Sequence, residues 1–165
     1  MIFVLNNIRS AWNVGSAFRT ADCLGASIIL VGYTPRPVGA NVKLINKTAI
    51  GAENYVKWQD FELANEVFEK FDNCVHLAAE ITDKSEDIFD FINNSADSIL
   101  NKIRQKDEVL IWFGNEISGV ELGVLSRCHK TLHLPMSGQK ESLNIASSLA
   151  AFGYLIKFGM GSQGS

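Results

Sequence analysis

The sequence lacks the features that mark membrane, secreted and zinc-binding proteins. No apolar run approaches the roughly 20 residues that a membrane-spanning helix needs, and the N-terminal MIFVL is too short for a signal peptide. The three cysteines, Cys23, Cys74 and Cys128, include no C-x-x-C pair, which argues against a zinc ribbon and a disulfide framework. We therefore expect a reduced, cytoplasmic protein with no metal and no membrane association.

Several nucleotide-binding and catalytic motifs are also missing. No G-x-G-x-x-G follows an apolar run, which disfavours a dinucleotide site, and no G-x-S-x-G indicates a nucleophilic serine. Residues 114–119 (GNEISG) have the glycine spacing of a phosphate loop, but Val120 and Glu121 stand where Lys and Ser/Thr are needed. His129 and His133 lie four residues apart in a stretch that reads as extended strand, which would place them about 13 Å apart, too far to share a metal.

The chain has 165 residues, of which 47% are hydrophobic and 20% charged, enough to form one packed domain. We expect that domain to span residues 1–158, followed by a flexible tail at 159–165 (GMGSQGS).

Apolar patterning predicts alternating strands and helices, and hence an α/β fold with a mainly parallel sheet flanked by helices. The expected strands are residues 2–6, 27–31, 55–58, 74–79, 109–113 and 131–134. The expected helices are residues 10–24, 60–71 with Asp60 as N-cap, 85–104, 121–128 and 142–158 with Ser142 as N-cap. Residues 34–54, which contain two prolines and two glycines, are expected to form a long loop.

Ligands of open α/β sheets bind beyond the carboxyl ends of the strands, so the loops there are the candidate sites. In the first, Asn13, Ser16, Arg19 and Thr20 share a helix face, which indicates either an anion site or a capped helix with a surface arginine. In the second, Glu116 either forms a hydrogen bond to a neutral or cationic ligand or belongs to a tight turn, in the first turn of a helix. The third, residues 134–144, joins the last strand to the last helix. Trp112 is expected in the core, whereas Trp12, beside the first loop, remains open as a base-stacking residue.

Together these loops resemble the SpoU (TrmH-type) RNA 2′-O-ribose methyltransferases of the SPOUT superfamily. Residues 13–26 (NVGSAFRTADCLGA) are similar to the first family motif. Residues 112–120 (WFGNEISGV) with 132–138 (LHLPMSG) are similar to the second, and residues 141–150 (ESLNIASSLA) to the third. Residues 47–53 (KTAIGAE) resemble a further segment frequent in the family.

The resemblance implies a fold with a C-terminal trefoil knot, a homodimer, and methylation of a ribose 2′-hydroxyl in tRNA or rRNA. It implies S-adenosylmethionine as cofactor, held in the knot mainly through backbone at Gly114, Leu134, Met136 and Leu143, with Ala78 as a further contact. It also implies Arg19 as the central catalytic residue, with Asn13, Glu116, Ser142 and Asn144 in support and the partner subunit completing the site. Because an arginine is a poor base, we expect Arg19 to anchor a phosphate and stabilise the developing alkoxide.

Many relatives carry an N-terminal RNA-binding extension, whereas this chain starts at its first expected strand. Substrate capture is therefore expected to rely on the catalytic domain and its dimer. Two rival hypotheses are a catalytically silent RNA-binding dimer of the same fold and a small-molecule nucleotide-binding protein. Intact Arg19, Glu116 and Asn144 disfavour the first rival, and the missing glycine and lysine motifs disfavour the second.

The formal net charge of −3 is unevenly distributed along the chain. Residues 60–108 hold 13 of the 18 acidic residues but only 5 of the 15 basic ones. We expect this acidic excess to lie away from the motifs, leaving a basic set free for RNA. That set is Arg9, Arg19, Arg36, Lys43, Lys47, Lys57, Arg127, Lys130 and Lys140.

Overall fold

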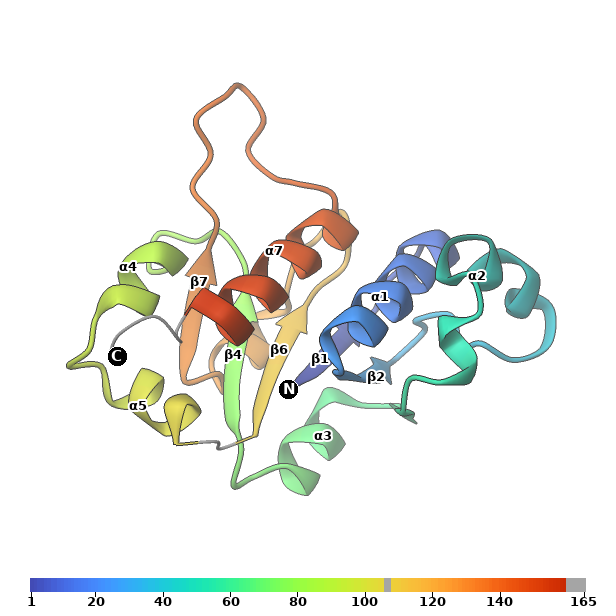
Figure 1. Ribbon diagram of the computed structural model, residues 1–165, viewed down its shortest axis with the longest axis horizontal. Coiled ribbons are helices and arrows are strands. Elements are labelled where there is room, and N and C mark those ends of the chain that lie inside the picture. The colour runs from blue at the N-terminus through green and yellow to red at the C-terminus, as the bar shows by residue number, and fades with distance from the viewer. Residues whose placement is uncertain (106–107, 160–165) are drawn as a thin grey trace.

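The computed structural model describes residues 1–105 and 108–159, and within them a sheet of seven strands forms the centre of the molecule (Figure 1). Its strands are β1 (Ile2–Asn6), β2 (Ser27–Val31), β3 (Trp58–Phe61), β4 (Val75–Ala79), β5 (Glu86–Asp87), β6 (Val109–Phe113) and β7 (Lys130–His133). They lie in the order β3-β2-β1-β6-β4-β7-β5, and every neighbouring pair is parallel. The expected α/β fold with a parallel sheet is confirmed.

Helices cover both faces of this sheet, as the alternating pattern predicts. They are α1 (Ala11–Leu24), α2 (Val42–Ala49), α3 (Ala64–Lys70), α4 (Ile88–Asn93), α5 (Ser98–Arg104), α6 (Leu122–Leu125) and α7 (Ile145–Phe158). Helices α1 and α7 lie side by side on one face, with α2 beyond α1 (Figure 1).

The strands alternate their side chains between two hydrophobic cores because successive residues of a strand point to opposite faces. Phe3, Leu5 and Ile111 pack into the larger core, on the side of α1 and α7. Val4 and Trp112 pack into the smaller core, on the side of α3 and α6. Burial on both faces explains why the central strands read as unbroken apolar runs in the sequence.

An aromatic stack fills the smaller core. Phe68 of α3 lies 4.6 Å, centroid to centroid, from both His76 and Trp112. The Trp112 indole N–H donates to His76 Nδ1 at 3.0 Å, so His76 Nε2 carries the proton that is donated to the Phe71 carbonyl. Burial lowers the pKa of His76 and keeps the imidazole neutral. Trp112 is therefore a core residue, as expected.

The expected loop at residues 34–54 is wrong in its middle, because α2 forms there. Only Ile45 and Ala49 of this helix are buried, while Val42, Leu44 and Ile50 are exposed. Ile45 and Ala49, four residues apart, form a short apolar stripe, and the contact of this stripe with α1 holds the helix in place. A stripe this short does not stand out among the prolines and glycines of residues 34–54.

The expected helix at residues 60–71 begins too early. Residues 58–61 instead form β3, whose register pairs Leu30 with Asp60 and Val31 with Phe61. Asp60 is thus a strand residue and not an N-cap, and α3 starts only at Ala64. The pairing of β3 with β2 overrides the local helical pattern.

The expected helix at residues 85–104 is divided into β5, α4 and α5. Asp87 caps α4 by accepting from Phe89 N, and Asp97 caps α5 by accepting from Ile99 N and Leu100 N. Each aspartate is the N-cap of a separate helix, so two short helices form in place of one long helix.

The last helix also starts later than expected. Asn144, not Ser142, caps α7, with its side-chain oxygen accepting from Ala146 N at 2.8 Å. Of the expected tail, Gly159 is the C-cap of α7 and residues 160–165 lie outside the described residues. The trefoil knot stays a prediction. None of the described helices combines the length and hydropathy needed to cross a bilayer.

Candidate active site

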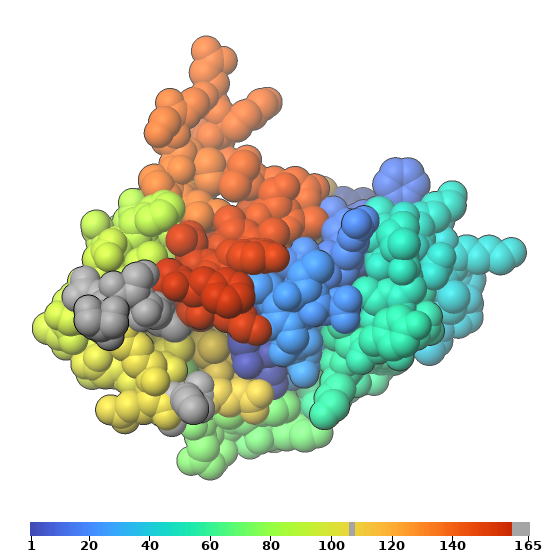
Figure 2. Space-filling model, in the orientation of Figure 1, coloured from blue at the N-terminus to red at the C-terminus, as the bar shows by residue number. Residues whose placement is uncertain are grey.

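A cavity of about 620 Å³ opens at the carboxyl ends of β4, β6 and β7. The segment between β7 and α7, residues 134–144, rises from the body of the molecule beside it (Figures 1 and 2). The cavity is lined by Ala79, Glu80, Ile81, Phe113, Gly114, Asn115, Glu116, Ile117, Gly119, His133, Leu134, Met136, Glu141, Ser142, Leu143, Asn144, Ile145, Ser148 and Phe152. This set includes residues of the second and third sequence motifs.

The turn after β6 forms one wall and depends on two glycines. Asn115 and Gly119 pair backbone to backbone, with N···O distances of 3.0 and 2.9 Å. A Cβ on Gly114 would lie 2.2 Å from the Gly119 carbonyl carbon and oxygen. Gly119 has φ +70°, and a Cβ there would lie 2.4 Å from Glu80 Oε2. Both positions therefore require glycine to keep the turn this tight.

Glu80 is a site residue that the sequence reasoning missed. Its Oε2 accepts from Val120 N at 2.7 Å and its Oε1 from Ile81 N at 3.1 Å, so it fastens the turn after β6 to the end of β4. Its position directly after a predicted strand was the available signal. It also contradicts the expectation that the acidic excess of residues 60–108 lies wholly away from the motifs.

Glu116 holds the start of α1 against the second motif. Its carboxylate accepts from Arg9 N at 2.9 Å, Ser10 N at 3.1 Å and Asn13 Nδ2 at 3.0 Å. Partial burial opposes ionisation, but these hydrogen bonds outweigh it and hold the pKa of Glu116 below its ordinary value. The anion at the beginning of α1 is thus the protein's own carboxylate, and Glu116 does not begin a helix.

Asn13 and Asn144 extend this network to the third motif. Asn144 Nδ2 donates to Asn13 Oδ1 at 3.2 Å, and Asn13 Nδ2 in turn donates to Glu116. The Asn144 oxygen meanwhile caps α7. Residues 131 positions apart in the sequence are therefore connected in one polar chain.

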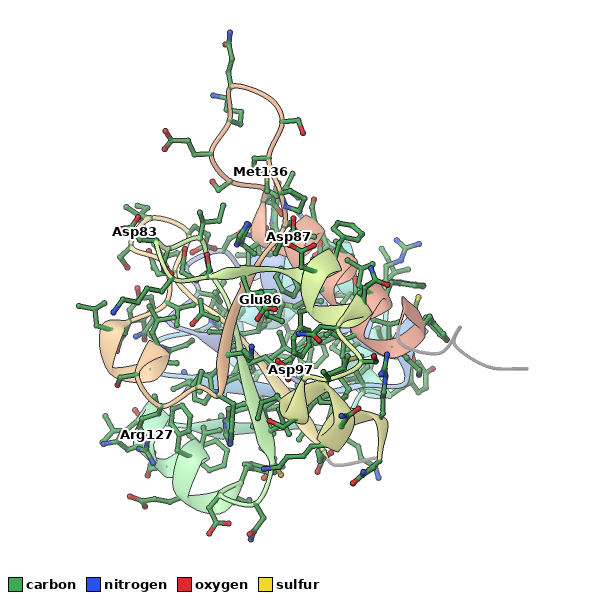
Figure 3. The ribbon with its side chains drawn as sticks, turned by 90° about the vertical axis from the view of Figure 1, so that its left-hand side faces the viewer. Asp83, Glu86, Asp87, Asp97, Arg127 and Met136 are labelled. Atoms are coloured by element: carbon green, nitrogen blue, oxygen red, sulfur yellow. The ribbon has the colours of Figure 1, made fainter. Side chains whose placement is uncertain are left out.

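The residues expected to hold a cofactor lie mostly at the cavity. Gly114, Leu134, Met136 and Leu143 line it, whereas Ala78 is fully buried inside β4 and its neighbour Ala79 forms the wall. Figure 3 shows Met136 at the base of the projecting segment 134–144.

The residues expected to act in catalysis are divided between two places. Glu116, Ser142 and Asn144 line the cavity, and Asn13 reaches it through its hydrogen bonds. Arg19 does not line the cavity; its side chain is exposed two turns further along α1 and forms no salt bridge with a described residue. A single chain therefore does not bring Arg19 to the other four.

Asn7 forms a second group of hydrogen bonds with residues of the turn after β6 and with Glu121. It has φ +56°, a left-handed conformation that asparagine tolerates better than most side chains. Asn7 Nδ2 donates to Glu121 Oε1 at 2.6 Å, and the backbone carbonyl of Asn7 accepts from Asn115 Nδ2 at 2.8 Å. Asn115 Nδ2 also donates to the Tyr33 hydroxyl at 2.7 Å. These asparagines follow β1 and β6, which is the sequence signal that could have identified them.

His133 brings an oriented imidazole to the cavity wall. The Ser85 hydroxyl donates to the Thr82 carbonyl at 2.8 Å, so it accepts the proton of His133 Nδ1 at 3.0 Å. His133 Nε2 is then the nitrogen left to accept a hydrogen bond. Among the described residues, no three His, Cys, Asp or Glu side chains are arranged to hold a metal.

The expected basic set is smaller than the sequence suggests. Lys130 forms salt bridges with Glu86 at 2.7 Å and Asp97 at 2.9 Å, and Arg36 forms one with Asp60 at 3.2 Å. The acidic edge of the sheet is visible in Figure 3, where Asp83, Glu86 and Asp87 lie below Met136. The charges of Lys130 and Arg36 are therefore partly neutralised within the protein.

Comparison with known families and curated proteins gives a consistent result. The model of the SpoU rRNA Methylase family matches residues 1–154. The 23S rRNA (guanosine-2′-O-)-methyltransferase RlmB of Blochmanniella floridana is 24% identical over 156 residues, covering 92% of this chain and 55% of that protein. An uncharacterized tRNA/rRNA methyltransferase of Borreliella burgdorferi is 26% identical over 157 residues, covering 94% of this chain and 63% of that protein. The chain thus spans a little over half the length of these relatives.

Solved structures share the fold. The SpoU methyltransferase AviRb of Streptomyces viridochromogenes, in complex with AdoMet, has a TM-score of 0.81 at 22% identity, covering 99% of this chain and 61% of that one. The A. aeolicus TrmH/SpoU tRNA modifying enzyme has a TM-score of 0.75 at 17% identity, covering 95% of this chain and 73% of that one. At these identities the likeness establishes the architecture.

Proposed function

The chain belongs to the SpoU rRNA methylase family, and we propose that it is a cytoplasmic S-adenosylmethionine-dependent methyltransferase acting on a ribose 2′-hydroxyl of tRNA or rRNA. The observation that carries this proposal is the chain of hydrogen bonds from Asn144 through Asn13 to Glu116. It joins the three family motifs at one cavity. The names of the curated relatives, all of them RNA methyltransferases, support the same reaction.

The residues of the cavity fit S-adenosylmethionine. Its volume of about 620 Å³ falls within the usual range for small-molecule sites. Gly114 gives a ligand access to the backbone, Leu134 and Met136 supply apolar surface, and the carboxylates of Glu80 and Glu116 favour a cationic group. When bound, the cofactor supplies an electrophilic methyl group on a positively charged sulfur.

The remaining work of the chain is to position the ribose and manage its proton. Positioning a hydroxyl in line with a methyl donor supplies much of the acceleration in such a transfer. We assign Arg19 to anchor an RNA phosphate and stabilise the charge that develops on the ribose oxygen. Glu116 and Asn144 hold the motif loops in register, and Ser142 lies on the cavity wall to contact the substrate. A phosphate or water takes the proton, since a guanidinium is already protonated.

A homodimer is part of the proposal because Arg19 lies outside the cavity of its own chain. Arg19 is exposed on α1, and the neighbouring helix α7 has a face where Ala146 and Ala150 are only partly buried and Tyr154 is exposed. Small side chains there let a second copy approach closely. Docking on this face brings Arg19 of each copy toward the cavity of the other.

The decisive test is transfer of tritiated methyl groups from S-adenosylmethionine to total RNA, followed by mapping of the modified ribose. Calorimetry with the cofactor alone provides the second measurement. We expect cofactor binding and a 2′-O-methylated nucleotide. No cofactor binding would refute the proposal, and binding without transfer to any RNA would favour a catalytically silent RNA-binding protein.

The role of Arg19 has its own test. Arg19→Lys keeps the charge but loses the planar, bidentate guanidinium, so we expect kcat to fall at least about tenfold with unchanged thermal stability. Mixing Arg19→Lys with a cavity variant such as Asn144→Ala should restore part of the activity if sites are shared between subunits. A normal kcat for Arg19→Lys would contradict the specific guanidinium role.

A further inference from the structure

Trp12 is exposed to solvent in the first turn of α1. Its side chain is 56% exposed, whereas Trp112 is fully buried and Trp58 is partly buried. A single exposed aromatic residue is ordinary on a protein surface, so its meaning depends on its surroundings.

The backbone that carries Trp12 is firmly held. The Thr48 hydroxyl of α2 donates to the Trp12 carbonyl at 2.8 Å. One turn further, a Cβ on Gly15 would lie 2.2 Å from the Ile45 carbonyl oxygen, so α1 and α2 touch backbone to backbone. The next residue, Asn13, belongs to the polar chain at the cavity. Trp12 is therefore a large flat side chain on a rigid support beside the proposed active site.

Exposed positive charges lie on the segments that form this support. Arg9 precedes α1, and Lys43 and Lys47 lie four apart on α2, so they share one helix face. All three are exposed, and none forms a salt bridge with a described residue. Arg19, seven residues after Trp12, lies on the same stripe of α1 about 10 Å away.

The opposite side of the cavity has the reverse charge. Asp83, Glu86 and Asp87 lie at the β5 edge below Met136 (Figure 3), and the nearby cation Lys130 is engaged by Glu86 and Asp97. A polyanion is attracted to the α1–α2 side and repelled from the β5 edge.

On the premise that the proposed function is correct and RNA is the substrate, we propose that Trp12 stacks on an unpaired base next to the methylated nucleotide. Arg9, Lys43 and Lys47 hold the flanking phosphates. Aromatic side chains inside basic surfaces bind single-stranded nucleic acid in this way, because every base has a flat face to stack on. Trp12 therefore directs the enzyme to loops and single-stranded segments and away from continuous duplex.

Fluorescence and binding measurements on the full chain test this role. The probe is a mixed-sequence single-stranded 12-nucleotide RNA, with the same strand in a duplex for comparison. We expect the single strand to quench the emission of the exposed Trp12, and Trp12→Ala to raise its Kd at least about fivefold. Trp12→Phe should recover most of the affinity, and the duplex should show little difference between variants. Phe89→Ala, which removes an exposed aromatic side chain from α4 near the β5 edge, is the matched control and should bind normally.

The outcomes separate this inference from the proposed function. If unmutated protein methylates RNA and binds the single strand, but Trp12→Ala binds equally well, the stacking role is wrong and the proposed function stands. If unmutated protein neither binds nor methylates RNA, the proposed function fails and this inference fails with it. Emission of Trp12 that changes with protein concentration and not with RNA would show that a second copy of the chain covers Trp12, which also overturns the inference.

Discussion

Glu116→Gln is the substitution that most directly tests the architecture of the site. In the structure, Oε2 accepts from Arg9 N, and Oε1 accepts from Ser10 N and Asn13 Nδ2. A glutamine of the same size has only one oxygen, and its amide group must face at least one of these three donors. The variant keeps the shape of the site but loses both the charge and one acceptor.

The cost follows from the number and kind of hydrogen bonds. Bonds to a charged acceptor contribute roughly twice as much as neutral ones, but the carboxylate is largely exposed and water can replace part of the loss. We therefore expect a destabilisation of about 1–2 kcal/mol, which lowers Tm by about 3–6 °C in a chain of this size.

The pH dependence gives the reasoning a second, independent test. The hydrogen bonds hold the pKa of Glu116 below its ordinary 4.5 in the folded state, so its contribution is fully present well above pH 4.5. It is lost as the pH falls through the folded-state pKa. Thermal unfolding of both proteins from pH 7 to pH 3.5 should show a difference in Tm that is constant near neutrality and shrinks below pH 4.5.

The control for this experiment is Glu69→Gln. Glu69 is an exposed glutamate on α3 and makes no hydrogen bond through its side chain with a described residue. Its replacement should leave Tm within about 1 °C at every pH, because isolated surface substitutions rarely exceed 0.5 kcal/mol. A Glu116→Gln variant that melts like the unmutated protein at pH 7 would refute the reasoning. So would a difference that persists unchanged at pH 3.5.

Three further predictions follow from single contacts. Gly114→Ala should weaken S-adenosylmethionine binding at least about tenfold in calorimetry, because its Cβ meets backbone at 2.2 Å, whereas Gly123→Ala, with open space around its Cβ, should bind normally. Burial raises the pKa of Cys128 to about 12, so iodoacetamide at pH 8 should label the exposed Cys23 first; equal labelling by peptide mass spectrometry would contradict this. Trp112→Phe should lower the free energy of unfolding in urea by about 1–3 kcal/mol, because a buried imidazole nitrogen loses its donor; unchanged stability would refute that assignment.

The sheet could be predicted from the sequence because its central strands are buried on both faces. Residues 2–6, 27–31 and 109–113 are continuous apolar runs, and the structure places β1, β2 and β6 at those positions. The expected strand at 74–79 starts one residue before β4, and the expected strand at 131–134 is shifted by one residue from β7. Such strands can be predicted from their own apolar residues, without information from the segments around them.

Helix α2 and strand β3 could not be predicted in the same way, because tertiary contacts determine their secondary structure. Helix α2 depends on the close approach of Gly15 to Ile45, and nothing in residues 34–54 alone indicates that contact. Strand β3 depends on pairing with β2, which draws Asp60 away from the capping role its sequence suggests. In both cases a segment with weak local preference takes the structure that its partner imposes.

The site shows the same division between local and distant information. The sequence predicts Glu116, Ser142 and Asn144 as site residues, and the structure places all three at one cavity. The sequence could not show which hydrogen bonds each of these side chains makes. Ser142 has the residue type of an N-cap, yet Asn144 takes that role: its side-chain oxygen caps α7 while its side-chain nitrogen donates to Asn13. A serine hydroxyl can likewise accept one hydrogen bond and donate another, but its side chain is shorter and reaches less far from the start of the helix. The position of α7 is therefore set by the same amide that joins the motifs, and substitutions at Asn144 should disturb the helix start and the cavity together.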